Sequence, residues 1–390
     1  MASLIDDLQE EGFVLPDFRN SNLEVARQLA ASDHGNMIGD KEKKVFLVID
    51  GLGYNLFEKV VKKKGNAFGI ELDDARRITT VFPSTTMNVM SSIYSGKTTA
   101  EHGLLANNVF IREYGMPVNA IGLSPTALRG SHGNKILPEF IYPKSDVISA
   151  IKGRGKKLKI IINETLSYSG MSSFMFQKED IVKFVTFEDM LVKIKKLVES
   201  GDTDFIMAYF DMLDHAEHVF DPISEEVEES LAGYLISLER ILLPALKGSG
   251  YDLIITADHG HIRTPFVRDI KILPGDKMLD FLITPPYGES RVSFFMVRDS
   301  SRRIFEEYVE KTLGNAGKLV DADELISTGI FGKKKIDERF RYRFGTHVLI
   351  MKGDNAFGYL YPGVERKIFE TKGGHGSLSA DEMYVPLILV

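Results

Sequence analysis

The sequence contains four short, almost uninterrupted apolar runs, and each of them closes on a polar residue. Three end in aspartate, at Asp50, Asp211 and Asp258, and one ends in Asn163. Apolar runs this short, rich in branched and aromatic side chains, are typical of strands that are buried on both faces of a parallel sheet. The runs are KVFLVID (44–50), KLKIIIN (157–163), DFIMAYFD (204–211) and YDLIITAD (251–258).

Amphipathic segments separate these runs. Residues 187–200 and 225–247 carry apolar side chains at helical spacing, and the closing VPLILV predicts a last strand. Strands that alternate with helices indicate an α/β fold with a mostly parallel central sheet. Ligands of such sheets bind beyond the carboxyl ends of the strands, so we expect the strand-end acids to share one rim.

Composition limits the chemistry that this rim can carry. The chain has 390 residues and no cysteine, which excludes disulfides, thiolate metal ligands and a cysteine nucleophile. Any metal must then be held by carboxylate oxygen and imidazole nitrogen. The net charge of −7 argues against a protein that coats nucleic acid. The N-terminal stretch is acidic, and no apolar run approaches the ~20 residues of a membrane span. We therefore expect a cytoplasmic protein without membrane association.

The character of the sequence changes between residues 265 and 366, which predicts an inserted α+β cap. Here RVSFFMVRD indicates a strand and SRRIFEEYVEKTLG a helix. The basic run 333–343 could meet an anionic substrate, but a solvated strand pair is the interpretation we favour. Residues 1–264 and 367–390 would then form the two parts of a catalytic core. The stretch 111–156 indicates a long active-site loop or a surface excursion.

Six side chains that can bind metal follow predicted strands or lie in helical or glycine-rich motifs. Singly, each is also typical of a turn, a salt bridge or an incidental histidine. Jointly they supply three carboxylates and three imidazoles, which would serve two adjacent divalent cations and leave open positions for a substrate. The six residues are Asp50, Asp214, His218, Asp258, His259 and His375.

A run of hydroxyl side chains offers a nucleophile. Ser84, Thr85 and Thr86 precede MNVMSSIYSG, a predicted short helix, and all three are natural N-caps. The free N–H groups and the positive end of a helix dipole suit a phosphoryl anion. These hydroxyls could instead only cap the helix, but a metal beside one of them would lower its pKa and make it a nucleophile.

Six motifs, taken in their order along the chain, resemble those of the type I phosphodiesterase/nucleotide pyrophosphatase family of the alkaline phosphatase superfamily. They are VIDGLG, FPSTTMN, SGKTTAEHGLLANN, DHAEH, TADHG and GGHG. The resemblance runs from Asp50 to the C-terminus and implies an alkaline-phosphatase-like core that transfers phosphoryl groups through a phospho-threonine. Counted from Gly96, the family's spacing implies Thr86 as the nucleophile, with Thr85 as second choice, and Asn107 as a phosphate contact.

The resemblance also divides the ligands between two divalent ions, for which we expect Zn²⁺, with Mn²⁺ as the alternative. Asp214, His218 and His375 would hold one ion, and Asp50, Asp258, His259 and Thr86 would hold the other. The sequence departs from better-known members directly after the nucleophile. Residues 87–90 are Met-Asn-Val-Met where those members have Phe-Pro-Asn-His, which leaves the substrate open.

The expected function is hydrolysis of a phosphodiester or pyrophosphate bond in a small phosphorylated substrate, with a nucleotide among the candidates. One alternative is a phosphomonoesterase or a phosphonoacetate-type phosphonate hydrolase on the same metals, and another is a non-catalytic binding protein on this scaffold. A monoesterase needs a further cation, for which Lys97, Lys135 and the basic run are candidates. A nucleobase would need an aromatic platform, from Tyr54, Phe82, Tyr114 or Tyr142. No direct catalytic role is assigned to His34, His102, His132, His215, His261 or His347, although His261 could lie behind a ligand or face the substrate.

Overall fold

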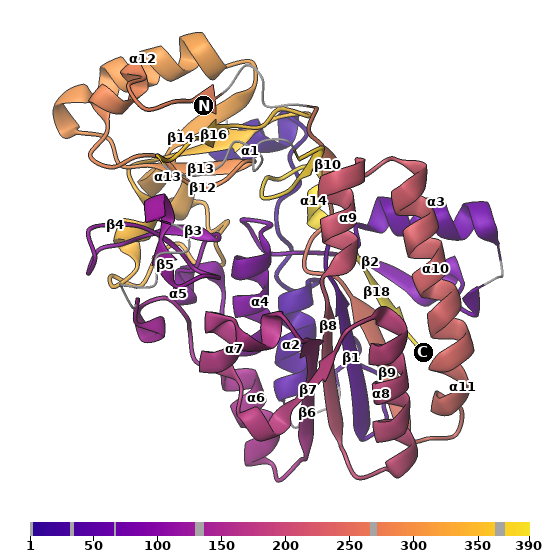
Figure 1. Ribbon diagram of the computed structural model, residues 1–390. Coiled ribbons are helices and arrows are strands. Elements are labelled where there is room, and N and C mark those ends of the chain that lie inside the picture. Colours follow the sequence, from indigo (N-terminus) through magenta and orange to yellow (C-terminus); the bar gives the residue numbers. More distant parts are fainter. Residues whose placement is uncertain (1–2, 32–34, 66–67, 129–135, 266–270, 363–370) are drawn as a thin grey trace.

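The structure is a computed structural model that describes residues 3–31, 35–65, 68–128, 136–265, 271–362 and 371–390. Two sheets of seven strands organise this part of the chain. The mostly parallel sheet, called the central sheet below, lies low in Figure 1, and the antiparallel second sheet lies above it. No helix among the described residues is both long and apolar enough to cross a bilayer.

The central sheet has the order β2-β18-β9-β1-β8-β6-β7. All four apolar runs are confirmed as parallel neighbours in it, as β1, β6, β8 and β9. The predicted last strand is also present, but it runs antiparallel between β9 and β2. The strands are β1 (Lys43–Ile49), β2 (Ala75–Thr79), β6 (Leu158–Asn163), β7 (Ile181–Phe184), β8 (Phe205–Phe210), β9 (Tyr251–Thr256) and β18 (Tyr384–Leu389).

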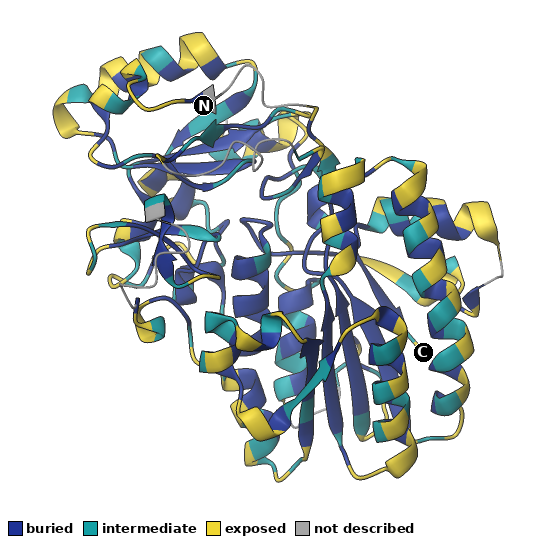
Figure 2. Cartoon of the chain, in the orientation of Figure 1, coloured by how far each residue is buried: buried dark blue, intermediate teal, exposed yellow. Residues whose placement is uncertain are grey.

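Helices cover both faces of this sheet, so its inner strands are buried, as the dark blue arrows in Figure 2 show, whereas the edge strands β2 and β7 are partly exposed. One face carries α2 (Asn22–Ala30), α4 (Thr86–Ser95) and α6 (Asp146–Gly153), and the other carries α3 (Tyr54–Lys64), α8 (Phe187–Ser200), α10 (Glu225–Ile241) and α11 (Leu243–Leu246). The predicted α8 has the expected bounds. The segment expected as one helix over 225–247 divides after Ile241, because Pro244 cannot continue a helix.

The second sheet is antiparallel and has the order β14-β15-β13-β12-β3-β4-β5. Three of its strands come from residues 108–125, which overlap the stretch that the sequence indicated as a loop. The proposed cap boundary of 265–366 stays a prediction, but strands from outside it complete this sheet. The strands are β3 (Asn108–Ile111), β4 (Met116–Asn119), β5 (Ser124–Pro125), β12 (Tyr287–Glu289), β13 (Val292–Phe295), β14 (Gly317–Asp321) and β15 (His347–Met351).

Shorter elements connect the two sheets and cover the second one. The predicted helix of the cap is α12 (Arg302–Leu313). Leu8 of α1 packs in the same core cluster as Val348 and Ile350 of β15. The other elements used below are α1 (Leu4–Glu10), α5 (Thr99–His102), α7 (Gly170–Met175), α9 (Met212–Phe220), α14 (Ala380–Met383), β10 (Ile262–Arg263) and β17 (Gly373–Gly374).

The basic run 333–343 does not form the expected strand pair. It consists of turns followed by a 3-10 helix, η9 (Arg341–Phe344). Arg343 is buried and donates to the carbonyl oxygen of Gly103 at 3.0 Å, and Lys333 pairs with Glu101 at 2.7 Å. These cations therefore hold the run against residues 101–103 rather than facing a substrate.

A buried ion pair ties the C-terminal segment to the second sheet. Arg291, directly before β13, donates to both carboxylate oxygens of Glu382 at 3.2 and 2.8 Å, and neither side chain is exposed. Glu382 also accepts from the backbone N–H of Ser377 at 2.9 Å and from the hydroxyl of Ser379 at 2.6 Å. Because Ser377 follows His375 by two residues, this network fixes the loop that carries that histidine.

We expect Glu382→Ala to destabilise the protein by about 3–5 kcal/mol, because it leaves the Arg291 guanidinium buried and unpaired. Urea denaturation measures the change. Glu307→Ala is the matched control, since the Arg303–Glu307 pair is exposed and such pairs contribute about 0–1 kcal/mol. Equal stability of the two variants would contradict the structural role of the buried pair.

Candidate active site

The carboxyl ends of the central strands bring the predicted acids together. Asp50 follows β1, and Asp258 follows the neighbouring β9. The backbone N–H of Gly51 donates to Asp258 Oδ1 at 3.2 Å, and the N–H of Asp214 donates to the carbonyl of Asp50 at 3.1 Å. Residues more than two hundred positions apart in the sequence thus meet at one edge of the sheet.

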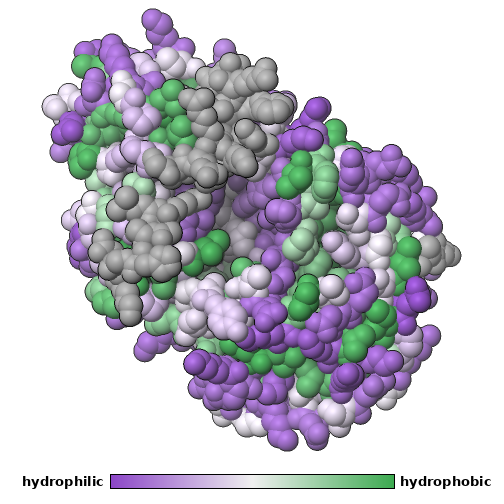
Figure 3. Space-filling model, in the orientation of Figure 1, coloured by the Kyte–Doolittle hydropathy of each residue, from purple (hydrophilic) through white to green (hydrophobic). Residues whose placement is uncertain are grey.

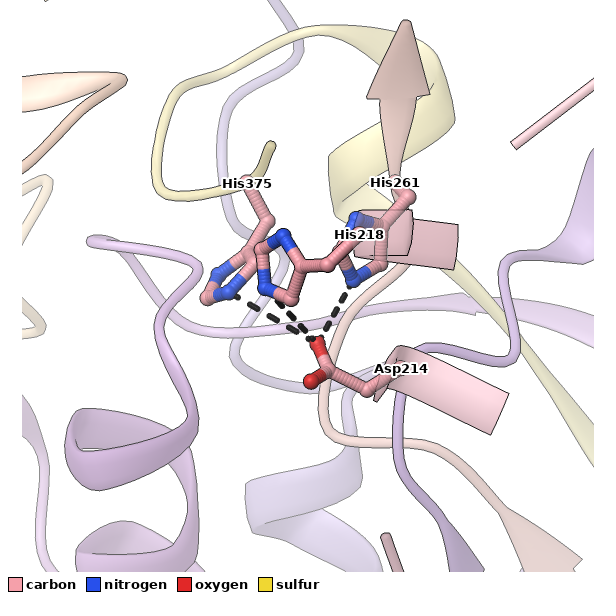
Figure 4. Close-up of side chains that lie close together, drawn as sticks. All are labelled: Asp214, His218, His261 and His375. Atoms are coloured by element: carbon pink, nitrogen blue, oxygen red, sulfur yellow. Dashed lines mark hydrogen bonds and ion pairs between the residues drawn. The ribbon is translucent and has the colours of Figure 1, made fainter. Parts of the chain in front are cut away.

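One group of potential metal ligands surrounds Asp214 (Figure 4). Its Oδ1 lies 3.5 Å from Nε2 of His218, one turn further along α9, and 3.7 Å from Nε2 of His375, which follows β17. A third imidazole, His261, comes from the residue before β10 and lies closest, with Nε2 at 2.6 Å from the same oxygen. The group therefore contains one histidine beyond the predicted set.

A second group consists of Asp50, Asp258 and His259, all of which are buried. His259 Nε2 lies 3.5 Å from Asp50 Oδ1 and 3.3 Å from Asp258 Oδ2. The hydroxyl of Thr86, the first residue of α4, lies 3.1 Å from the same nitrogen. The hydroxyl of Tyr209 donates to the other oxygen of Asp50.

The two groups are adjacent. The rings of His259 and His375 stack with centroids 3.8 Å apart and planes inclined by 12°. Since one ring belongs to each group, the six side chains that the sequence singled out lie in a single cluster, with the Thr86 hydroxyl beside it.

Three of the histidines are oriented by the same kind of contact. His218 Nδ1 lies 2.8 Å from the carbonyl oxygen of Gly373. His375 Nδ1 lies 3.1 Å from the carbonyl oxygen of Ser84, and His259 Nδ1 lies 3.2 Å from that of Gly260. A carbonyl only accepts hydrogen bonds, so Nδ1 carries the proton and the Nε2 lone pair faces the carboxylates. This is how proteins orient imidazoles that bind metal.

The charges of the cluster fit divalent cations. Burial, and then the carboxylates of Asp258 and Asp214, raise the pKa of Asp50 well above its usual value. One carboxylate oxygen of Asp50 and one of Asp258 are buried without a hydrogen-bond partner among the described residues. Burial and the neighbouring histidines lower the pKa of His375 well below its usual value, so this ring is neutral. Carboxylates and neutral imidazoles that converge in this way are suitable ligands for Zn²⁺ or Mn²⁺.

His261 differs from the other three imidazoles. Its Nδ1 is buried and has no partner among the described residues, and a buried N–H without an acceptor is costly. The proton therefore belongs on Nε2, which donates to Asp214. We infer that His261 orients the Asp214 carboxylate and is not a ligand itself.

The sequence carried one sign of this role. His261 stands two residues after His259, with only Gly260 between them. A Cβ atom at Gly260 would lie 2.1 Å from the carbonyl oxygen of Asp381 and 2.6 Å from Cα of Gly53. A side chain at this position would clash with the backbone of two other segments, so only glycine fits between the two histidines.

Thr85 and Thr86 have different surroundings. The Thr85 hydroxyl is buried and donates to the carbonyl of Leu105 at 2.8 Å, whereas the Thr86 hydroxyl faces His259. Asn107 accepts at Oδ1 from the N–H of Ile121 at 3.1 Å, which leaves its amide N–H groups to donate elsewhere. Ile121 and Thr86 line the same pocket.

The remaining candidates have structural partners or lie elsewhere. His102 is buried against the hydroxyl of Ser92 at 2.9 Å, and His347 lies 3.0 Å from Glu306. His215 is exposed. Lys97, just beyond the opposite end of α4 from Thr86, pairs with Asp146 at 2.7 Å. His34, His132 and Lys135 lie outside the described residues.

The model of one protein family, described as type I phosphodiesterase / nucleotide pyrophosphatase, matches residues 44–377. No curated protein sequence matches the chain. The match of the family model spans both ligand groups and the threonine.

The solved structures similar to this one include a phosphonoacetate hydrolase and two ectonucleotide pyrophosphatases / phosphodiesterases. Phosphonoacetate hydrolase from Sinorhizobium meliloti, in complex with phosphonoformate, has a TM-score of 0.64 at 16% identity, covering 90% of this chain and 91% of that chain. Human ectonucleotide pyrophosphatase / phosphodiesterase 5 has a TM-score of 0.63 at 16% identity, covering 89% and 87%. An inactive threonine-to-alanine variant of the murine protein, in complex with AMP, has a TM-score of 0.58 at 17% identity, covering 89% and 87%. At these identities the likeness establishes the fold, and it confirms the alkaline-phosphatase-like core.

We expect His261→Ala to keep the metal content of the wild type when metal is in excess, but to lose about 10–100-fold in affinity at the Asp214 group, the usual effect of removing a side chain that orients a ligand. Elemental analysis and competition with a chelator measure the two quantities. His218→Ala is the control, and it should lose one ion per chain. A His261→Ala protein with the same reduced content as His218→Ala would make His261 a ligand.

Proposed function

The chain belongs to the type I phosphodiesterase / nucleotide pyrophosphatase family, and from that premise we propose that it is a two-metal hydrolase that cleaves phosphodiester or pyrophosphate bonds through a covalent phospho-threonine. The observation that carries the proposal is the position of the Thr86 hydroxyl. It lies 3.1 Å from His259 Nε2, beside three carboxylates and at the start of α4.

The ligands follow from the two groups. Asp214, His218 and His375 would hold one divalent ion, and Asp50, Asp258, His259 and Thr86 would hold the other. Bound ions would lower the pKa of the Thr86 hydroxyl and neutralise the charge on the phosphoryl oxygens. Tyr209 and His261 support this arrangement through their hydrogen bonds to Asp50 and Asp214.

Thr86 is the nucleophile in this mechanism. The hydroxyl gives up its proton to water and Oγ1 bonds to phosphorus, while the bond from phosphorus to the leaving oxygen breaks on the opposite side and the leaving oxygen keeps the electron pair. The first N–H groups of α4 have no partner within the helix, and with the Asn107 amide they can donate to the phosphoryl oxygens. Water then cleaves the bond between Oγ1 and phosphorus, which restores the Thr86 hydroxyl and releases a phosphate or phosphomonoester.

A diester fits the described surroundings better than a monoester. The third non-bridging oxygen of a monoester needs a cationic partner, but Lys97 and the cations of the basic run discussed above pair with other side chains or carbonyls. None of the described residues that line the pocket beside Thr86 is charged. All seven proposed positions carry competent side chains, which disfavours a non-catalytic binding protein.

We expect Thr86→Ala to bind metal as the wild type does and to lose turnover of bis(p-nitrophenyl) phosphate by about 10³-fold or more, because the covalent route is removed. Thr85→Ala is the matched control and should keep most of the activity, since its hydroxyl faces Leu105. Initial rates with added Zn²⁺ or Mn²⁺ measure both variants, with p-nitrophenyl phosphate and phosphonoacetate as competing substrates. Near wild-type turnover by Thr86→Ala would refute the assignment, and a preference for the monoester or the phosphonate would refute the substrate class.

We also expect metal removal to make the stability of the fold depend on pH. The pKa of Asp50 is higher in the folded metal-free chain than in the unfolded chain, so its contribution is present below the unfolded pKa of about 4 and is lost as the pH rises through the folded pKa. Relative to chelated Asp50→Asn, the thermal midpoint of the chelated wild-type protein should therefore fall as the pH rises above about 4. The lowered pKa of His375 acts in the opposite direction, but it does so in both proteins and cancels in this comparison. The metal-loaded wild-type protein should change less. A chelated protein with the same midpoint as the loaded one at every pH would contradict the proposed ligand groups.

A further inference from the structure

A concave pocket, the kind of surface feature in which small-molecule ligands bind, is lined in part by Thr86. Thr86, Met87 and Met90 of α4 form one wall, and Ile162 at the end of β6 and Met171 of α7 lie in others. Tyr209, which holds Asp50, also lines it. The pocket therefore adjoins the Asp50 group on the side of the nucleophile.

The lining of this pocket is apolar and uncharged. Three of its described residues are methionines, whose flexible thioethers adapt to apolar groups of different shape. The hydroxyls of Ser169 and Ser172 are 3.1 Å apart and bond to each other. The hydroxyl of Tyr94 makes no hydrogen bond within the described residues, and burial raises the pKa of this phenol, so it stays uncharged.

A second hollow continues the pocket outward, since Ile121 and Ser169 line both. Its other lining residues include Leu123, Pro138 and Phe174, and none of those described is charged. Figure 3 shows a hollow between the part of the molecule built on the antiparallel sheet and the part built on the central sheet, with both hydrophilic and hydrophobic side chains around it. The two pockets therefore adjoin each other, and the described lining of both is uncharged.

We propose that the group that stays attached to phosphorus through the first step is an uncharged alkyl or aryl ester group, bound in the methionine-lined pocket. This inference rests on the proposed function. An in-line displacement expels the leaving oxygen on the side of phosphorus opposite Thr86. The pocket lies beside Thr86, so it receives the retained group and not the leaving group.

A nucleoside suits this pocket poorly. Ribose and base bring several hydrogen-bonding groups, and burial without partners would be costly for each of them. Of the aromatic side chains considered for a base platform, Phe82 stacks on Phe331 at 5.5 Å and the Tyr142 hydroxyl donates to the carbonyl of Ala120. Neither lines the pocket, where Tyr94 and Phe176 pack edge to face at 4.9 Å.

The test varies only the retained group. The metal-loaded enzyme is assayed with p-nitrophenyl methyl, butyl, hexyl and phenyl phosphates and with the p-nitrophenyl ester of thymidine 5′-phosphate, which all release p-nitrophenolate. Burial of each methylene is expected to raise kcat/KM up to about fourfold, so the butyl ester should exceed the methyl ester by at least about tenfold. Binding of methyl and butyl phosphate to Thr86→Ala, measured by calorimetry, should follow the same order.

A charge in the pocket should remove this selectivity. Met171 is only partly buried, so Met171→Lys is expected to fold and to lower the butyl-to-methyl ratio at least fivefold. Ile236→Lys is the matched control on α10, where the side chain is exposed, and it should keep the wild-type ratio. If Met171→Lys fails to fold, the ester series and the binding series still decide.

The outcomes separate this inference from the proposed function. Hydrolysis of none of the esters under any metal condition would overturn the proposed function. Hydrolysis of all of them with equal kcat/KM, or fastest hydrolysis of the thymidine ester, would leave the phosphodiesterase in place and overturn the apolar assignment of the pocket.

Discussion

Asp50, Asp214 and Asp258 approach one another at the carboxyl end of the central sheet, and their mutual repulsion is the constraint on which the rest of the site depends. Burial makes this repulsion stronger, as the raised pKa of Asp50 indicates. Three of the imidazoles direct Nδ1 to backbone carbonyls, and their Nε2 atoms face the same centre as the carboxylates. The arrangement calls for cations, and divalent metals fit the donors.

Much of the surrounding structure holds these groups in place. The α/β core delivers Asp50, Asp214 and Asp258 because neighbouring parallel strands end at one edge. The loop that carries His375 is held in place differently, since it lies in an irregular segment and not at the end of a strand of the central sheet. The buried Arg291–Glu382 pair joins that segment to the second sheet, so the second sheet contributes to the geometry of the proposed metal ligands.

Charged and apolar side chains are unevenly distributed around Thr86, the proposed nucleophile. Charged and titratable side chains gather around the two ligand groups, whereas the described lining of the pocket beside Thr86 is apolar and uncharged. Such a site separates two tasks. The polar cluster acts on the phosphoryl group that all substrates of the proposed reaction share, and the apolar pocket distinguishes substrates by the organic group attached to it. The departure at residues 87–90 from better-known members of the family falls in α4, where Met87 and Met90 line that pocket.

The strands were predictable from the sequence, because a strand buried on both faces is a continuous apolar run with a closing polar residue. The six potential ligands were predictable because they close such runs or stand in short motifs of Asp, His and Gly. The role of His261 was not predictable in this way, since it depends on which ring nitrogen finds an acceptor across the fold. The same holds for β3–β5, which complete a sheet whose other strands lie more than 150 residues away. It also holds for Lys333 and Arg343 of the basic run, whose partners are distant in the sequence. Local pattern thus determined the elements and the kinds of ligand. Only the tertiary structure decided which hydroxyl faces the cluster, which histidine orients a carboxylate and what chemistry lines the pocket, because those properties arise between residues that are remote in the sequence.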